Sequence, residues 1–161
     1  NYFLSYNIRQ YHHFDVNNYK IIMLNKNIFI ASDHAGFDLK TKLLKNFPKI
    51  NDLGTKTDES VDYPDFAHKL TKKVLKNKNN VGILICGTGV GMSIAANRKK
   101  GIRAGLANNS KIARLIRKHN DANVLVLPGK FINTTEAKKS VQAFLSTKFE
   151  SGRHKRRIKK L

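Results

Sequence analysis

One reactive side chain and a group of glycines occupy neighbouring positions in the middle of the chain. Cys86 is the only cysteine, and it directly precedes the segment that contains Gly87, Gly89 and Gly91. Alternate glycines let a backbone turn sharply and direct several N–H groups at one point, and a helix that begins there adds the positive end of its dipole. Such a turn binds an anion and favours the thiolate of a neighbouring cysteine. We therefore expect Cys86 to act as a base or nucleophile, with a buried core thiol as the alternative.

Two histidines stand among other polar residues. His34 follows Asp33 after a short apolar run, and His119 is followed by Asn120 and Asp121. The chain contains 6 histidines, and most lone histidines are structural or exposed. Only these two lie beside predicted strands in polar surroundings. We therefore treat His34 and His119 as candidate functional residues.

The spacing of these residues does not match common cofactor or metal motifs. No Gly-Lys-Ser/Thr follows the glycines, and no acidic residue lies about 20 residues further on to hold a ribose. Nucleotide binding is therefore not expected. One cysteine and dispersed histidines show no recognised ligand spacing, so we predict no metal site and no cofactor.

The elements that position these residues are visible as an alternation of apolar patterns. From residue 28 onward, strand-sized apolar runs alternate with segments of helical spacing. The predicted strands are 28–32, 50–54, 81–86, 102–107 and 123–127, and the predicted helices are 37–47, one that begins at Pro64, 92–99, 110–118 and 135–148. Five such repeats predict an α/β, Rossmann-like fold of three layers, in which a five-stranded parallel sheet is covered by helices on both faces.

This fold predicts where the candidate residues meet. Ligands of open parallel sheets bind beyond the carboxyl ends of the strands, which is where Asp33, His34 and the turn after Cys86 are expected. His119 instead comes just before the fifth strand. It therefore needs a long loop or a neighbouring subunit to reach the same edge.

Length and composition bound the class of protein. The chain has 161 residues, of which 40% are hydrophobic and 26% charged, which suits one globular domain and excludes a fibrous or wholly disordered chain. No apolar run approaches the roughly 20 residues of a membrane helix, so no membrane association is expected. A single cysteine cannot form an internal disulfide, which favours a reducing, cytoplasmic location.

The start of the chain differs from the rest. Residues 1–22 are rich in Tyr and Asn, show neither strand nor helix periodicity, and lack the features of a secretory signal. We expect 1–25 to be a disordered extension and 26–161 to be the folded domain. A true start at Met23 and an organelle-targeting role are the alternatives.

The charge is strongly positive, with 31 Lys and Arg against 11 Asp and Glu and a formal net charge of +20. Such a charge is typical of nucleic-acid binding, but the lysines are scattered, which favours a solvated surface. The C-terminal segment 152–161 is dense in basic residues and is expected to form a basic helix or a loose tail. On a helix, Arg153 and Arg157 share a face and can bind one phosphate.

Taken together, six segments resemble the type B ribose-5-phosphate isomerases, in the same order and over about residues 26–160. Galactose-6-phosphate and allose-6-phosphate isomerases share much of this pattern. The segments are Ser32-Asp33-His34-Ala35-Gly36, Asp62-Tyr63-Pro64, Ile85-Cys86-Gly87-Thr88-Gly89-Val90-Gly91, Ala95-Ala96-Asn97, His119-Asn120-Asp121-Ala122-Asn123 and Gly152-Arg153-His154.

The resemblance implies a cofactor-free aldose–ketose isomerase that interconverts ribose 5-phosphate and ribulose 5-phosphate through an enediolate. In the family pattern, the residue matching Cys86 is the base that removes the C2 proton, and the one matching His119 helps to open the sugar ring. Asp33 matches a residue that handles ring or hydroxyl protons. The remaining implied contacts are the enediolate-binding turn of Gly87, Thr88, Gly89, Val90 and Gly91, and the substrate-binding Tyr63 and Asn120.

The resemblance also assigns the phosphate to positions matching His34, Arg153 and Arg157. Lys130 stands where the family commonly has Arg, and a lysine cannot make the bidentate fork of a guanidinium. A homodimer or homotetramer with shared active sites is implied, which would bring His119 to the strand ends. The alternatives are a hexose-6-phosphate isomerase, a nucleic-acid-binding module and an inactive scaffold subunit.

Overall fold

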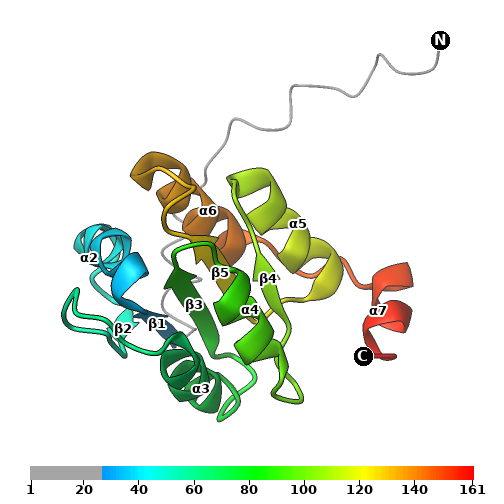
Figure 1. The fold of residues 1–161 in the computed structure, drawn as a ribbon. Helices are drawn as coiled ribbons and strands as arrows, with labels where there is room; N and C mark the ends of the chain where they lie inside the picture. Colours follow the sequence, from blue (N-terminus) through cyan, green and yellow to red (C-terminus); the bar gives the residue numbers. More distant parts are fainter. Residues whose placement is uncertain (1–26) are drawn as a thin grey trace.

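A five-stranded parallel sheet forms the centre of the protein (Figure 1). The computed structural model describes residues 27–161, so the expected extension over 1–25 lies outside the described residues. The strand order is β2-β1-β3-β5-β4, and every pair of neighbours is parallel. The strands are β1 Ile28–Ser32, β2 Asn51–Asp52, β3 Val81–Cys86, β4 Ala104–Leu106 and β5 Val124–Pro128.

Helices follow the strands as predicted, with shifted ends. They are the short 3-10 helix η2 His34–Gly36 and the α-helices α2 Phe37–Asn46, α3 Tyr63–Val74, α4 Val90–Asn97, α5 Ser110–Asn120, α6 Thr134–Ser146 and α7 Gly152–Ile158. Helix α4 begins at Val90 rather than at the predicted residue 92, because Gly89 supplies a left-handed N-cap with φ 78°. None of the helices in residues 27–161 is long and apolar enough to cross a membrane.

Two separate hydrophobic clusters fill the space between the sheet and its helices, which gives three layers. The central strands β3 and β5 are buried along their whole length, as expected for strands covered on both faces. One face packs against side chains of α2, α5 and α6 such as Leu43, Ala113 and Phe144, and the other against side chains of α3 and α4 such as Leu70 and Met92. The predicted α/β, Rossmann-like fold is confirmed.

A buried lysine joins α2 to the edge strand β2. The side chain of Lys40 is 1% exposed, and its Nζ lies 2.6 and 2.7 Å from the two carboxylate oxygens of Asp52. Asp52 also accepts a hydrogen bond of 2.9 Å from the backbone N–H of Gly54. The backbone of Gly54 then accepts from Ser32 N–H at 2.8 Å, so this network holds the segment after β2 against the end of β1.

The basic C-terminal segment is helical rather than loose. Helix α7 lies beside the end of α5 and projects from the body of the molecule (Figure 1). It is anchored by His154, which is buried although its neighbours Arg153 and Arg157 are exposed.

Candidate active site

The ends of β1 and β3 place two acidic or nucleophilic side chains at one edge of the sheet. Cys86 is the last residue of β3 and Asp33 directly follows β1, and their side chains are buried, with residues 5% and 6% exposed. The two strands are in register, with Ser32 opposite Ile85. The N–H of Asp33 donates to the carbonyl of Ile85 at 3.2 Å, which ties the loop after β1 to β3. Asp33 and Cys86 therefore lie at the same end of the sheet, as the fold predicts.

The turn after β3 directs a backbone N–H at the sulfur of Cys86. Gly89 N–H donates to Cys86 Sγ at 3.2 Å, at the position that begins helix α4. Gly89 has φ 78°, and a Cβ there would lie 2.3 Å from Leu106 Cδ1, so only glycine fits without distortion. A hydrogen bond from the N-terminal turn of a helix stabilises negative charge on the sulfur. This geometry suits a thiolate that accepts a proton.

The rest of the turn is open to solvent and lies beside Lys130. Thr88 is exposed, and its Oγ1 accepts from Val90 N–H at 3.3 Å. The N–H of Lys130 donates to the Gly87 carbonyl at 3.0 Å. A Cβ at Gly87 would lie 3.7 Å from Lys130 Cδ, so the aliphatic part of this lysine runs along the turn. The end of the Lys130 side chain therefore lies beside the backbone of the glycine turn.

Two aromatic side chains come from segments at this end of the sheet. His34 follows β1 and is exposed, and its Nδ1 accepts from Val61 N–H at 3.2 Å. The ring of Tyr63, at the start of α3, lies against Gly91, where a Cβ would come 2.7 Å from Tyr63 Cζ. Gly91 therefore permits the close approach of Tyr63 to the glycine turn.

The other predicted site residues form a second group at the opposite edge of the sheet. His119 and Asn120 end α5 shortly before β5 begins, so they lie near the amino end of a strand whose carboxyl end pairs with Cys86. The rings of His119 and His154 stack with centroids 4.3 Å apart and planes 11° apart. A pocket of about 330 Å³ lies here and is lined by His119, Asn120, His154, Arg157, Ile158 and Leu161.

The electrostatics of this second group keep one histidine neutral. Burial lowers the pKa of His154, and repulsion from His119 and Arg153 lowers it further, against an opposing effect of Glu150. A hydrogen bond from Lys118 lowers the pKa of Glu150. The Glu150 carboxylate lies 3.1 Å from Lys118 Nζ and 4.0 Å from His119 Nε2. At neutral pH, His154 is therefore uncharged and Glu150 is an anion.

Three of these side chains are also the one close group of possible metal donors among the described residues. Single donor atoms of His119, Glu150 and His154 lie within 4.8 Å of one another, although the sequence spacing predicted no metal site. A metal ion binds in the plane of an imidazole, and two nearly parallel stacked rings share no such point between them. The group as arranged is therefore not a preformed metal site.

The single chain thus brings part of the predicted site together and separates the rest. The carboxyl-edge group consists of Asp33, His34, Tyr63, the turn from Cys86 to Gly91, and Lys130. The α5–α7 group consists of His119, Asn120, His154, Arg153 and Arg157. Sequence reasoning gave no role to His154, Glu150 or Val61, because their contacts join segments that are distant in the chain.

The ribose/galactose isomerase family model matches residues 28–161, which is the whole described domain apart from one residue. The chain belongs to this family. The match agrees with the resemblance of the sequence motifs, and it covers both the carboxyl-edge group and the α5–α7 group. The family pattern therefore includes the two edges that the single chain keeps apart.

Individual relatives and solved structures of the family are similar over almost their full length. A protein from Mycoplasma pneumoniae named probable ribose-5-phosphate isomerase B is 46% identical over 145 residues, which are 87% of this chain and 95% of the relative. The crystal structure of a ribose 5-phosphate isomerase from Thermotoga maritima has a TM-score of 0.79 at 54% identity and covers 84% of this chain and 95% of its own.

A third similar structure contains a sugar phosphate. Ribose-5-phosphate isomerase B from Mycoplasma genitalium, solved with bound ribulose-5-phosphate, has a TM-score of 0.79 at 49% identity and covers 84% of this chain and 93% of its own. These structures share the three-layer architecture of this family member.

Proposed function

We propose that this protein is a ribose-5-phosphate isomerase that interconverts ribose 5-phosphate and ribulose 5-phosphate through an enediolate, without a metal or organic cofactor. The observation that carries the proposal is the hydrogen bond from Gly89 N–H to Cys86 Sγ at the carboxyl edge of the sheet. This bond supports the proposed role of the Cys86 sulfur as the base, next to a turn whose backbone N–H groups would stabilise an oxyanion. Relatives that bear this activity in their names, and one that binds ribulose-5-phosphate, support the same substrate.

In the proposed mechanism, Cys86 moves the carbon-bound proton. The thiolate of Cys86 removes the proton from C2, the electron pair forms the C1–C2 double bond, and the aldehyde oxygen becomes an oxyanion. Backbone N–H groups of the turn and the hydroxyl of Thr88 stabilise this charge. Return of the proton to C1 completes the ketose, while the hydroxyl proton of C2 is transferred to the oxygen of C1. We assign the transfer of that oxygen-bound proton to Asp33, whose Oδ1 accepts from Gly36 N–H at 3.0 Å.

Binding of the phosphate and opening of the sugar ring need the other group. We assign the phosphate to His34 Nε2, Arg153 and Arg157, with Lys130 beside the turn as a further cation. His119 would exchange a proton with the oxygens of the sugar ring and so help to open it. Asn120 would contact the sugar. Because the α5–α7 group lies at the opposite edge of its own sheet, a site that contains all these residues requires a second subunit. We therefore propose a homodimer or homotetramer in which each site combines two chains.

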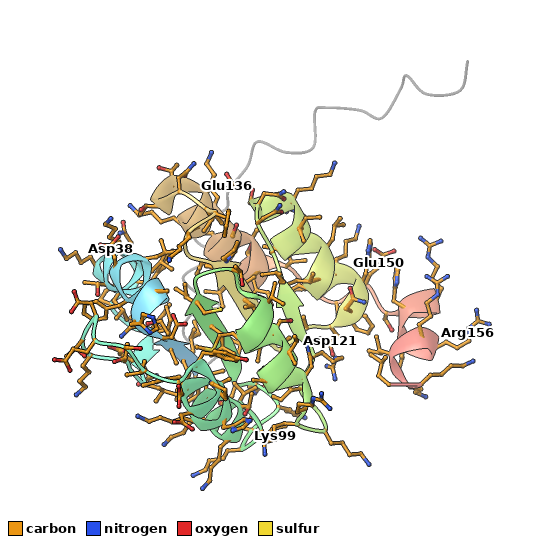
Figure 2. All side chains as sticks on the ribbon, in the orientation of Figure 1. Asp38, Lys99, Asp121, Glu136, Glu150 and Arg156 are labelled. Atoms are coloured by element: carbon orange, nitrogen blue, oxygen red, sulfur yellow. The ribbon has the colours of Figure 1, made fainter. Side chains whose placement is uncertain are left out.

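The alternatives are less well supported. A hexose-6-phosphate isomerase would use the same chemistry, and the family includes galactose isomerases. A nucleic-acid-binding module is disfavoured because, among the described side chains, nitrogen-tipped groups project around the whole outline of the molecule rather than along one stripe (Figure 2). The single cysteine and the metabolic relatives favour a cytoplasmic location.

The test is a direct assay of the purified protein in the presence of a metal chelator. Ribose 5-phosphate, allose 6-phosphate and galactose 6-phosphate are supplied separately, and ketose formation is followed. We expect turnover of the pentose in preference to both hexoses. Preference for a hexose would replace the proposed substrate, and no turnover of any of the three would refute the isomerase proposal. Salt-sensitive binding of RNA or DNA by an inactive protein would support the nucleic-acid module instead.

A further inference from the structure

The end of helix α5 adopts a backbone conformation that needs support. Asp121 follows the helix with φ 46° and ψ 41°, the left-handed region that side chains other than those of Asn and Asp adopt rarely. Its N–H donates to the Arg117 carbonyl at 3.1 Å, and Ala122 N–H donates to the Ile116 carbonyl at 3.1 Å. This turn directly follows Asn120, so any change in the turn moves the last residues of the helix.

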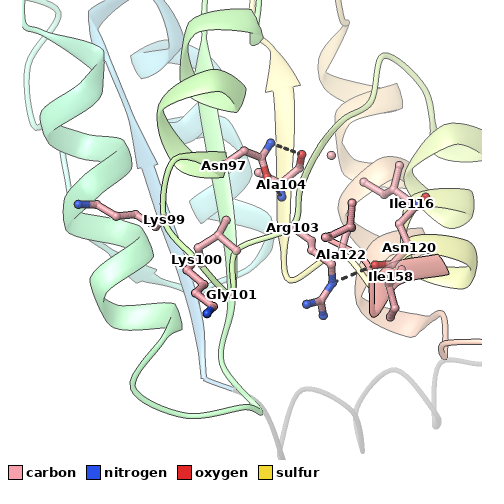
Figure 3. A pocket seen from close by; sticks show the side chains of 13 residues that line it. Asn97, Lys99, Lys100, Gly101, Arg103, Ala104, Ile116, Asn120, Ala122 and Ile158 are labelled. Atoms are coloured by element: carbon pink, nitrogen blue, oxygen red, sulfur yellow. Dashed lines mark hydrogen bonds between the residues drawn. The ribbon is translucent and has the colours of Figure 1, made fainter. Parts of the chain in front are cut away.

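Arg103, from the loop that leads into β4, holds this turn from outside the helix. Its Nε donates to the carbonyls of Asn120 at 3.0 Å and Asp121 at 3.1 Å, and its Nη2 donates to the Asp121 carbonyl at 2.8 Å and carboxylate at 3.0 Å. Figure 3 shows its side chain reaching from this loop to the end of α5. The carbonyls at a helix C-terminus carry partial negative charge, which a guanidinium neutralises while donating several bonds.

Arg103 is itself fixed at its backbone. Its N–H donates to the side-chain oxygen of Asn123 at 2.8 Å, and its carbonyl accepts from Asn123 N–H at 3.1 Å. The same amide side chain donates to the Gly101 carbonyl at 2.8 Å. The start of β5 therefore determines where the guanidinium of Arg103 sits, and the contact is not a loose surface pairing.

A second arginine completes the arrangement from within the helix. Arg117 Nη1 donates to the Asp121 carboxylate at 2.9 Å and to the Ala122 carbonyl at 2.6 Å, and its guanidinium lies 5.8 Å from the centre of the Phe144 ring. Burial lowers the pKa of Arg117, while the charge of Asp121 raises it. The Asp121 carboxylate thus joins the guanidinium of Arg117 in the helix to that of Arg103 in the loop before β4.

The two residues before this turn have little else to hold them. Within residues 27–161, neither the imidazole of His119 nor the side-chain amide of Asn120 forms a hydrogen bond. His119 has the stacking contact with His154 and a 4.0 Å approach to Glu150. The placement of both side chains therefore depends on the backbone at the end of α5, where Arg103 donates hydrogen bonds to the carbonyls of residues 120 and 121.

We propose that Arg103 is a positioning residue for the isomerase, because it fixes the end of α5 and thereby aims His119 and Asn120 at the substrate. This inference rests on the proposed function only for the step that His119 and Asn120 perform. In this proposal Arg103 acts through the backbone carbonyls of residues 120 and 121, to which it donates.

The kinetic test compares Arg103→Lys with Arg98→Lys. Arg98 is an exposed arginine whose side chain makes no hydrogen bond within the described part of the chain, so it is a matched control. Lysine keeps the positive charge at position 103. Its ammonium group lacks the planar array of N–H donors with which the guanidinium binds two carbonyls and a carboxylate. We expect kcat/KM for ribose 5-phosphate to fall about 10- to 100-fold in Arg103→Lys and to stay within about twofold of wild type in the control. Equal kcat/KM in Arg103→Lys and wild type would overturn the proposal.

Chemical rescue separates positioning from a loss of stability. Arg103 lines an open pocket of about 510 Å³ (Figure 3), through which a small cation can reach the vacated position. In Arg103→Ala, millimolar guanidinium should restore a measurable part of kcat/KM, whereas methylammonium at equal ionic strength should not. Equal effects of the two cations, or none, together with a lowered melting temperature, would assign Arg103 a purely structural role. If Arg103→Ala does not fold, Arg103→Lys decides the question.

A spectroscopic readout distinguishes failure of this inference from failure of the proposed function. The imidazole resonances of His119, assigned with a His119→Gln variant, should shift in Arg103→Lys while those of His34 stay unchanged. Unchanged His119 resonances with an active wild type would refute the positioning role alone. A wild type that turns over no ribose 5-phosphate refutes the proposed function, whatever the resonances show.

Discussion

The carboxyl-edge group and the α5–α7 group are built in different ways. The first is held by backbone: residues at the ends of adjacent strands, a glycine turn and a helix N-terminus place Asp33 and Cys86 with buried side chains. The second is held by side chains, through ring stacking between α5 and α7 and through arginine contacts between the end of α5 and the loop before β4. The parallel sheet dictates the first group, whereas the second depends on specific long-range contacts. In the proposed function, the first group carries out the chemical step, and the second serves recognition and ring opening.

The largest expected effect on kcat comes from removal of Cys86, the proposed chemical base of the carboxyl-edge group. Cys86→Ala should lower kcat by about 10²- to 10⁴-fold, since it removes the group proposed to take the C2 proton, while inorganic phosphate binds as before. Steady-state kinetics and calorimetry measure the two quantities. The same loss of kcat from Val81→Ala, a buried change at the other end of β3, would indicate that packing rather than proton transfer explains the result.

A complementation experiment tests whether the two groups come from different subunits. Cys86→Ala and His119→Ala should each be nearly inactive alone. Mixed and reassembled, they should regain about one quarter of wild-type activity, because about half of the dimers are mixed and each mixed dimer has one intact site. Variants mixed under conditions that prevent subunit exchange are the control. No recovery after demonstrated exchange would place both groups in one chain's site and contradict the shared-site proposal.

The frame of the carboxyl-edge group can be tested through the ion pair of the buried Lys40. Lys40→Met removes the partner of the Asp52 carboxylate, whose side chain is 32% exposed, so the free energy of unfolding should fall by about 1 to 3 kcal/mol. The matched change Lys42→Met breaks the exposed pair with Asp38 on the same helix and should cost no more than about 0.5 kcal/mol. Urea denaturation measures both values. Equal losses would show that the burial of Lys40 has no special role.

The smallest expected effect is a pH dependence confined to the α5–α7 group. The pKa of His154 is lowered in the folded protein, mainly by burial, so the unfolded or undocked state binds its proton more tightly. Stability of α7 docking is therefore full above the ordinary histidine pKa and decreases as the pH falls below it. Hydrogen exchange of α7 amides should be faster at pH 5.5 than at pH 8, and His154→Gln should weaken this difference.

Exchange in the central strands serves as the internal reference for that measurement. The amides of β3 and β5 should show no comparable pH effect once the intrinsic exchange rates are taken into account. A parallel change in all elements would indicate global destabilisation and contradict a local origin at His154.

Much of the fold is readable from the chain because strands and helices have different apolar periods. The buried run from Val81 to Cys86 predicted a central strand, and Pro64 correctly marked the start of α3. The second strand was predicted over 50–54 but spans only Asn51–Asp52. Residues 53–55 form backbone hydrogen bonds with β1 but belong to an irregular loop. The sequence does not decide between a basic helix and a loose tail for 152–161, because the buried residue that anchors this segment, His154, packs against His119, which is distant in the sequence.

The sequence by itself determined the alternation of strands and helices, the thiol before the glycine turn, and the family to which these motifs point. Each of these depends on near neighbours in the chain, where periodicity and residue type act directly. Only the tertiary structure decided that His119 stacks on His154 and that Arg103 donates hydrogen bonds to the end of α5. It also decided that the two groups lie at opposite ends of the strands of one sheet. Those contacts join residues that are far apart in sequence, and packing of the whole domain is needed to bring them within a few ångströms.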